Sequence, residues 1–117
     1  MGSSDLLTVD IGTRGGAVVV AVSGELDLAT VPVLRERLDS LEEVSTAPSP
    51  LVVDLSALTF IGSAGLALLV DLHHKCAERD IPLALVATGS VVPRAIQVTA
   101  LDQVFSMHGT VEEAISG

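Results

Sequence analysis

The stretch from Leu51 to Val70, LVVDLSALTFIGSAGLALLV, changes its hydrophobic pattern once, and this change constrains the fold more than any other feature. Its first part, Leu51 to Leu55, is a short apolar and β-branched run that follows Pro48 and Pro50, a pattern typical of a buried strand. From Ser63 onward the apolar residues recur at helical spacing. The sequence therefore predicts a strand, a tight Gly-rich loop and a helix, with a hydroxyl group at the helix N-terminus.

Length and composition favour one domain over residues 1–117. The apolar fraction is 49%, but aromatic residues make up only 2% of the chain, without Trp or Tyr. The core must therefore consist of Val, Leu, Ile and Ala side chains. Such residues suit a sheet that is covered by helices.

The charge balance bears on the partners of the chain. Fifteen acidic and six basic side chains give a formal charge of −9, which repels nucleic acid and anionic lipid surfaces. The single cysteine, Cys76, cannot form an internal disulfide, and residues 1–5 lack the pattern of a secretory signal. No apolar run is long enough for a membrane span. We expect a cytoplasmic protein that neither binds nucleic acid nor inserts directly into a membrane.

The order of the predicted elements indicates the architecture. Two strands, Leu6 to Ile11 and Ala17 to Ser23, should form a hairpin, and a helix capped by Thr30 should follow. After the central strand and helix we expect a strand over residues 82–86, a helix capped by Ser90, a weak strand over residues 103–107 and a short terminal helix. This order predicts an α/β fold with a mixed sheet of four to five strands and about four helices.

Ser63 is the strongest candidate for a functional residue. A phosphate on its hydroxyl would add a dianion at an exposed loop, where the helix dipole favours negative charge. The simpler interpretation is a serine that caps the helix beside packing glycines. The motif alone favours the capping role.

Enzyme and metal sites receive less support. Ser63, Asp102 and His108 follow the chain order of a hydrolase triad, but residue 61 is Ile61 where the nucleophile elbow requires Gly. His73 and Cys76 share one helix face, whereas a structural zinc site needs four ligands. We therefore expect no catalytic residues, no metal and no cofactor.

Two separated segments resemble the signatures of the STAS domains, and in particular of bacterial anti-sigma factor antagonists. The first is GELDLATVPVLRERL, from Gly24 to Leu38, and the second is the Leu51 to Val70 stretch. The resemblance implies a single STAS domain, without enzymatic activity, that binds an anti-sigma factor and thereby frees a sigma factor. It also implies that the anti-sigma factor is an ATP-dependent serine kinase, which phosphorylates the start of the second helix, and that a phosphatase reverses this step.

The central loop departs from the usual form of the family motif, Asp-Ser-Ser/Thr-Gly. Gly62 replaces the acidic residue and Ala64 replaces the second hydroxyl residue, so Ser63 is the only hydroxyl in the loop. Either the kinase uses Ser63 or the protein binds its partner constitutively. An alternative is an accessory STAS subunit of a lipid-transport ABC system, or another STAS regulator that does not act on sigma factors. The predicted partner-binding residues are Asp27, Thr30, Gly62, Ser63, Ala64, Gly65 and Leu66.

Overall fold

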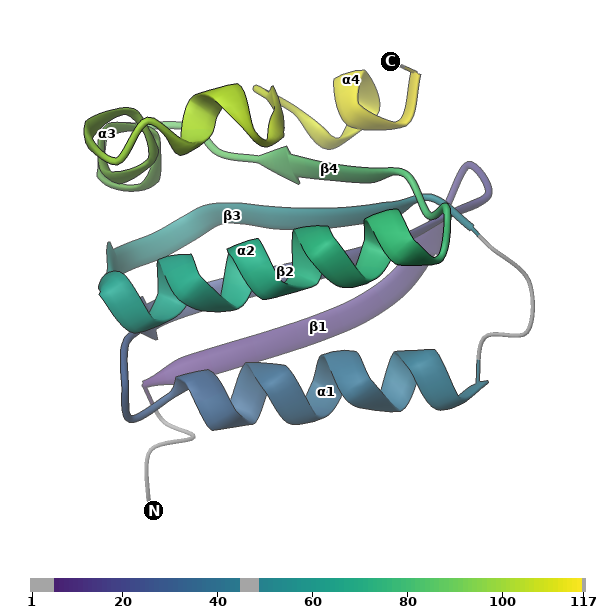
Figure 1. The fold of residues 1–117 in the computed structure, drawn as a ribbon, viewed down its shortest axis with the longest axis horizontal. Helices are drawn as coiled ribbons and strands as arrows, with labels where there is room; N and C mark the ends of the chain where they lie inside the picture. Colours follow the sequence, from purple (N-terminus) through teal and green to yellow (C-terminus); the bar gives the residue numbers. More distant parts are fainter. Residues whose placement is uncertain (1–5, 45–48, 117) are drawn as a thin grey trace.

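A five-stranded mixed sheet forms the centre of the protein in the computed structural model, which describes residues 6–44 and 49–116 (Figure 1). The strands are arranged in sequence order. The first two form an antiparallel hairpin, and the later strands pair in parallel. The strands are β1 (Leu7–Arg14), β2 (Ala17–Leu26), β3 (Leu51–Ile61), β4 (Leu83–Val86) and β5 (Ser106–His108).

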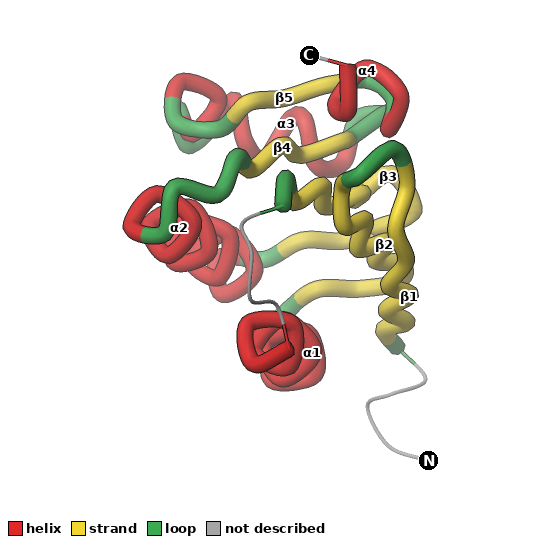
Figure 2. Tube along the Cα trace, turned by 90° about the vertical axis from the view of Figure 1, so that its right-hand side faces the viewer, coloured by secondary structure: helices red, strands yellow, loops and turns green. Residues whose placement is uncertain are grey.

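Helices cover the two faces of the sheet unequally. The two long helices, α1 (Val31–Val44) and α2 (Ser63–Glu78), lie together on one side (Figure 2). The shorter α3 (Val91–Val98) packs against β3, and a 3₁₀ turn, η2 (Leu101–Gln103), precedes β5. The terminal α4 (Val111–Ser116) contacts β3, β4 and β5. No helix in the described part of the chain has the length and hydropathy needed to cross a membrane.

Alternating side chains divide the core into two clusters, as expected for strands buried on both faces. Val20, Val53 and Leu85 belong to the main cluster under α1 and α2. Their neighbours on the opposite face, among them Val52 and Val86, form a smaller cluster that α4 covers. The core is aliphatic apart from Phe105 and Cys76, which agrees with the composition.

The predicted fold class is confirmed, but three strands extend beyond their predicted ends. The strand expected to end at Ile11 continues to Arg14, through part of the predicted turn. The strand expected to end at Ser23 continues to Leu26, and the strand expected to end at Leu55 continues to Ile61. Register shifts between β2 and β3 interrupt the alternation of side chains in this region. Because strand prediction relies on regular alternation, the irregular pairing hides the extensions of β2 and β3 in the sequence.

Two of the smaller predictions are confirmed only in part, those for the Ser90 cap and for the last strand. Ser90 occupies the N-cap position of α3, although its side chain makes no capping hydrogen bond. The predicted strand over residues 103–107 is shorter and shifted, because residues 101–103 form η2. The composition of Ser45 to Pro50 also predicts a loop, and most of this segment lies outside the described residues.

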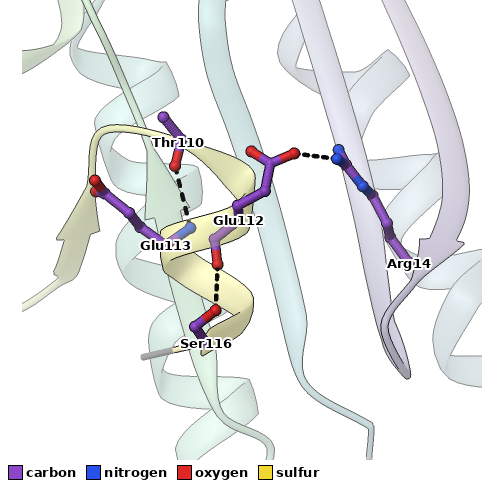
Figure 3. Close-up of polar contacts among 5 residues, drawn as sticks. All are labelled: Arg14, Thr110, Glu112, Glu113 and Ser116. Carbon is purple, nitrogen blue, oxygen red and sulfur yellow. Dashed lines mark hydrogen bonds and ion pairs between the residues drawn. The ribbon is translucent and has the colours of Figure 1, made fainter.

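The spacing of Thr110 and Glu113 predicts a capping box at the start of the terminal helix, and this prediction is confirmed in part. The Glu113 amide donates to Thr110 Oγ1 at 3.1 Å, as predicted (Figure 3). The Glu113 carboxylate, however, accepts from the Gly109 amide and not from that of Thr110. An ion pair between Arg14 and Glu112 joins this helix to the turn of the β1–β2 hairpin (Figure 3).

The two central strands reach beyond the rest of the sheet. β3 pairs with β4 only from Leu51 to Asp54, whereas its pairing with β2 continues to the partners Leu26 and Ile61. Helix α3 packs against β3 and contributes Val92 and Ile96 to the main core cluster. The chain segments that follow β2 and β3 therefore emerge together at one end of the molecule.

Candidate functional site

The candidate site consists of the two loops that follow β2 and β3, the segments of the predicted partner-binding residues. The last residues of the two strands, Leu26 and Ile61, are paired in parallel. One residue later, the Gly62 amide donates a hydrogen bond of 2.9 Å to the Leu26 carbonyl oxygen. The structure thus brings the segments around Asp27 and Ser63 to the same edge of the sheet, as the resemblance to the STAS domains implied.

Ser63 is the first residue of α2 and is exposed. The prediction that it caps the helix is wrong, because Gly62 occupies the N-cap position and no side-chain capping bond forms. The Gly62 carbonyl oxygen accepts the first helical hydrogen bonds, from the amides of Gly65 and Leu66 at 3.0 and 3.1 Å. The hydroxyl of Ser63 is therefore accessible at the positive end of the helix dipole.

Asp27 and Thr30 build the neighbouring loop through their own side chains. Asp27 Oδ1 accepts hydrogen bonds from the amides of Ala29 and Thr30, at 3.0 and 3.2 Å. Thr30 Oγ1 accepts from the Asp27 amide at 3.0 Å and donates to the Glu25 carbonyl oxygen at 2.8 Å. These bonds satisfy polar groups that would otherwise be left without partners where the chain turns from strand to helix.

The same contacts separate the roles of these two residues. Thr30 is fully buried, so its side chain shapes the loop from inside and does not lie on the surface. Asp27 is half-buried and keeps part of its carboxylate at the surface. Of the predicted partner-binding pair in this loop, only Asp27 is placed to touch a second protein.

Gly65 is a packing residue. It is buried, and a Cβ at this position would lie 2.9 Å from side-chain carbons of both Ile61 and Leu26. Only glycine lets the first turn of α2 approach the strand ends this closely. Ala64 and Leu66 are half-buried, and Leu66 packs against the main core cluster.

Two exposed apolar side chains at this end of the molecule were missed by the sequence analysis. Leu28 lies in the Asp27 loop with 81% of its surface exposed, and Phe60 lies at the end of β3 with 49% exposed. The Phe60 ring is close to the loop, since a Cβ on Gly62 would be 3.3 Å from its Cε2 atom. The sequence did contain a signal for them, because both are large apolar residues in segments that otherwise consist of polar or turn-forming residues. Phe60 was missed because the predicted strand ended before it.

The alternative catalytic site does not assemble. Strand pairing aligns His108 on β5 with Val86 and Asp54, whereas Ser63 follows the far end of β3. At about 3.3 Å per residue, the part of β3 beyond Asp54 extends the separation along the sheet by roughly 23 Å. His108 Nε2 instead contacts Ser106 Oγ at 3.0 Å.

The alternative metal site also lacks a set of ligands. The ring of His73 packs edge-on against Phe105, with ring centroids 5.9 Å apart. Cys76 is buried in the main core cluster. Within residues 6–44 and 49–116, no three His, Cys, Asp or Glu side chains converge on a common point where they could hold a metal ion.

The sequence matches a known domain family and is similar to the sequences of named proteins. The STAS domain family matches residues 8–114. Anti-sigma-F factor antagonist RsfB of Mycobacterium tuberculosis is 36% identical over 117 residues, all of this chain and 93% of the relative. RsfA of the same organism is 31% identical over 113 residues, which cover 97% of this chain and 88% of the relative.

A solved structure shows the same likeness in three dimensions. The crystal structure of an anti-sigma factor antagonist from Mycobacterium paratuberculosis superimposes with a TM-score of 0.87 at 34% sequence identity. The comparison covers 99% of this chain and 97% of that one. The similarity thus includes both loops of the candidate site.

Proposed function

Since the chain belongs to the STAS domain family, we propose that it is an anti-sigma factor antagonist, a regulatory protein that binds an anti-sigma factor and thereby frees a sigma factor for transcription. Relatives that match all or nearly all of this chain carry the name of this function, which supports the proposal. We place the protein in the cytoplasm, where sigma factors act, and assign it no catalytic activity. The binding surface comprises the loops after β2 and β3.

The hydrogen bond between Gly62 and Leu26 is the observation that carries this proposal. It joins the loop after β2 to the loop after β3, one from each segment that resembles a family signature, although α1 and β3 lie between these loops along the chain. Such preorganised loops lose little conformational entropy when a partner binds.

Ser63 is the proposed phosphoacceptor, and an ATP-dependent serine kinase activity of the anti-sigma factor is its proposed modifier. The hydroxyl is exposed, and Gly62 replaces it as the cap, so modification breaks no capping bond. The N-terminal turn of α2 would stabilise the phosphate within the protein. In the complex the phosphate would add bulk between the two surfaces and would have to lose its hydration against the partner's nonpolar surface, and both effects would release the partner. A phosphatase would then restore the binding-competent form.

Intact-mass spectrometry after incubation with ATP and each anti-sigma factor of the source cell tests this proposal. A pull-down of the wild type, Ser63→Ala and Ser63→Glu accompanies it. We expect a gain of one phosphate that Ser63→Ala abolishes, and binding that Ser63→Glu loses.

The other outcomes separate the alternatives. Binding without a phosphate would indicate a constitutive antagonist. Neither binding nor phosphate with any candidate would overturn the proposal in favour of a STAS subunit of a lipid-transport ABC system. Ser63→Ala also serves as the control for a serine hydrolase, because it would abolish such an activity while leaving partner binding intact.

A further inference from the structure

The candidate site exposes apolar surface that the fold itself does not use. Leu28 and Phe60 are two of the exposed large apolar side chains, at 81% and 49%, in a protein with few aromatic residues. They come from the neighbouring ends of β2 and β3, where Glu25 pairs with Phe60. Exposed apolar side chains that gather in one place mark sites of protein interaction, and aromatic residues such as Phe are enriched at interfaces.

The charge around these two side chains has one sign. The segments 24–30 and 58–68 contain Glu25 and Asp27 but no Lys, Arg or His. Glu25 is exposed and Asp27 is half-buried. A second copy of this chain would bring acidic groups against acidic groups, which disfavours self-association through this surface. A partner with basic side chains would instead be attracted.

Gly62 sets the position of the aromatic anchor. A Cβ on Gly62 would lie 3.3 Å from Cε2 of Phe60, which is closer than most Cβ contacts, and 3.6 Å from Cζ, which is an ordinary contact. The ring therefore occupies space that any other residue at position 62 would share. The residue that departs from the usual family motif thus determines where the apolar surface lies relative to Ser63.

We propose that Leu28 and Phe60 are the apolar anchors of the partner interface, and that the anti-sigma factor receives them in a nonpolar pocket bordered by Lys or Arg side chains. Gly62 is a positioning residue for Phe60, and Glu25 faces the basic border. This inference rests on the proposed function. It adds the residues that determine the choice of partner and the chemistry of the complementary surface.

Calorimetry tests this inference. It measures the affinities of Leu28→Ala, Phe60→Ala and Gly62→Ala for the anti-sigma factor that binds the wild type. We expect losses of about tenfold or more for the two anchors, as for central interface residues, and a smaller loss for Gly62→Ala. Glu25→Lys should weaken binding and reduce its dependence on salt.

Val104→Ala is the matched control. Val104 is also a large apolar side chain, 42% exposed, but it precedes β5, which begins level with Val52 and far from the end of β3. The affinity of Val104→Ala for the anti-sigma factor should equal that of the wild type. Thermal unfolding of each variant verifies that the fold is retained.

Two negative outcomes are distinguishable. If the wild type binds an anti-sigma factor and the anchor variants bind equally well, or the control loses as much as they do, this inference is overturned while the proposed function stands. Unchanged affinity and salt dependence in Glu25→Lys would overturn the basic border. If the wild type binds no anti-sigma factor, the proposed function fails, and the inference fails with it.

Discussion

The amide of Gly62 donates a hydrogen bond of 2.9 Å to the carbonyl oxygen of Leu26, directly beyond the last paired residues of β2 and β3. This contact extends the parallel ladder by one step into the loops. It fixes the start of α2 relative to the loop that contains Asp27. The geometry of the proposed binding surface therefore depends on the residues that pack beneath this contact.

The closest packing beneath the loops is at Gly65, and we predict that Gly65→Ala destabilises the protein. The added Cβ would lie 2.9 Å from carbons of Leu26 and Ile61, so the helix or the strand ends must shift. Overpacking of this kind costs about 1–3 kcal/mol. Urea unfolding of the variant measures the loss.

Gly12→Ala is the control for that substitution, because a Cβ at Gly12 meets nothing within 4 Å. Its free energy of unfolding should stay near that of the wild type. Equal stability of the Gly65 and Gly12 variants would show that the strand ends adjust freely to the extra atom.

Thr30→Val is predicted to destabilise the Asp27 loop. Valine has nearly the same shape, but it removes the buried hydroxyl that accepts from the Asp27 amide and donates to the Glu25 carbonyl oxygen. Leaving a buried polar group without a partner costs about 1–3 kcal/mol. Chemical denaturation should therefore show a lower midpoint.

Thr30→Ser keeps the hydroxyl and should recover much of the stability that Thr30→Val loses. A valine variant as stable as the wild type would contradict the role of Thr30 as the internal support of the loop. If the loop is distorted, the amide resonances of Asp27 and Ala29 should move in the valine variant and less in the serine variant.

How far the sequence predicts this structure depends on the regularity of each element. The change from strand pattern to helix pattern within the Leu51 to Val70 stretch predicted the central elements, because regular hydrophobic periods report burial directly. The ends of β2 and β3 were missed, since Gly24 and the register shifts break the alternation that strand prediction requires.

The candidate site shows the same division. Its segments were predicted from their motifs, and the parallel pairing of Leu26 with Ile61 brings them together. The burial of Thr30 and the exposure of Phe60 were not predictable, because both depend on contacts between residues distant in sequence. The capping role of Ser63 failed for a local reason: Gly62 takes the N-cap position.

Gly24 is predicted to tolerate no side chain. Its φ of +104° is unfavourable for other residues, and a Cβ would lie 2.1 Å from the Leu6 carbonyl oxygen. That carbonyl accepts from the Glu25 amide, so Gly24→Ala should displace the start of β1. We expect a loss above about 2 kcal/mol, because steric displacement adds to an unfavourable backbone conformation of about 1–3 kcal/mol.

Gly89→Ala separates these two contributions. Gly89 also has a positive φ, +79°, but a Cβ there meets nothing within 4 Å. Gly89→Ala should therefore lose only the part of the stability that comes from the unfavourable backbone conformation, and this loss should be smaller than that of Gly24→Ala. Equal losses of stability in the two variants would mean that the steric contact with Leu6 does not contribute to the destabilisation.

A negative charge at Ser63 is predicted to leave the folded protein intact. In Ser63→Glu the carboxylate lies at the N-terminal turn of α2, where the helix dipole stabilises an anion by about 0.3–1 kcal/mol. Ala77→Glu places the same charge near the C-terminal end, where it is unfavourable. Urea unfolding at low salt should therefore show a higher stability for Ser63→Glu than for Ala77→Glu, and high salt should reduce the difference.

If Ser63→Glu is the less stable variant, repulsion from Asp27 exceeds the stabilisation by the helix dipole, and phosphorylation would loosen the loop itself. If the predicted order is found, loss of partner binding by Ser63→Glu reports on the interface and not on unfolding.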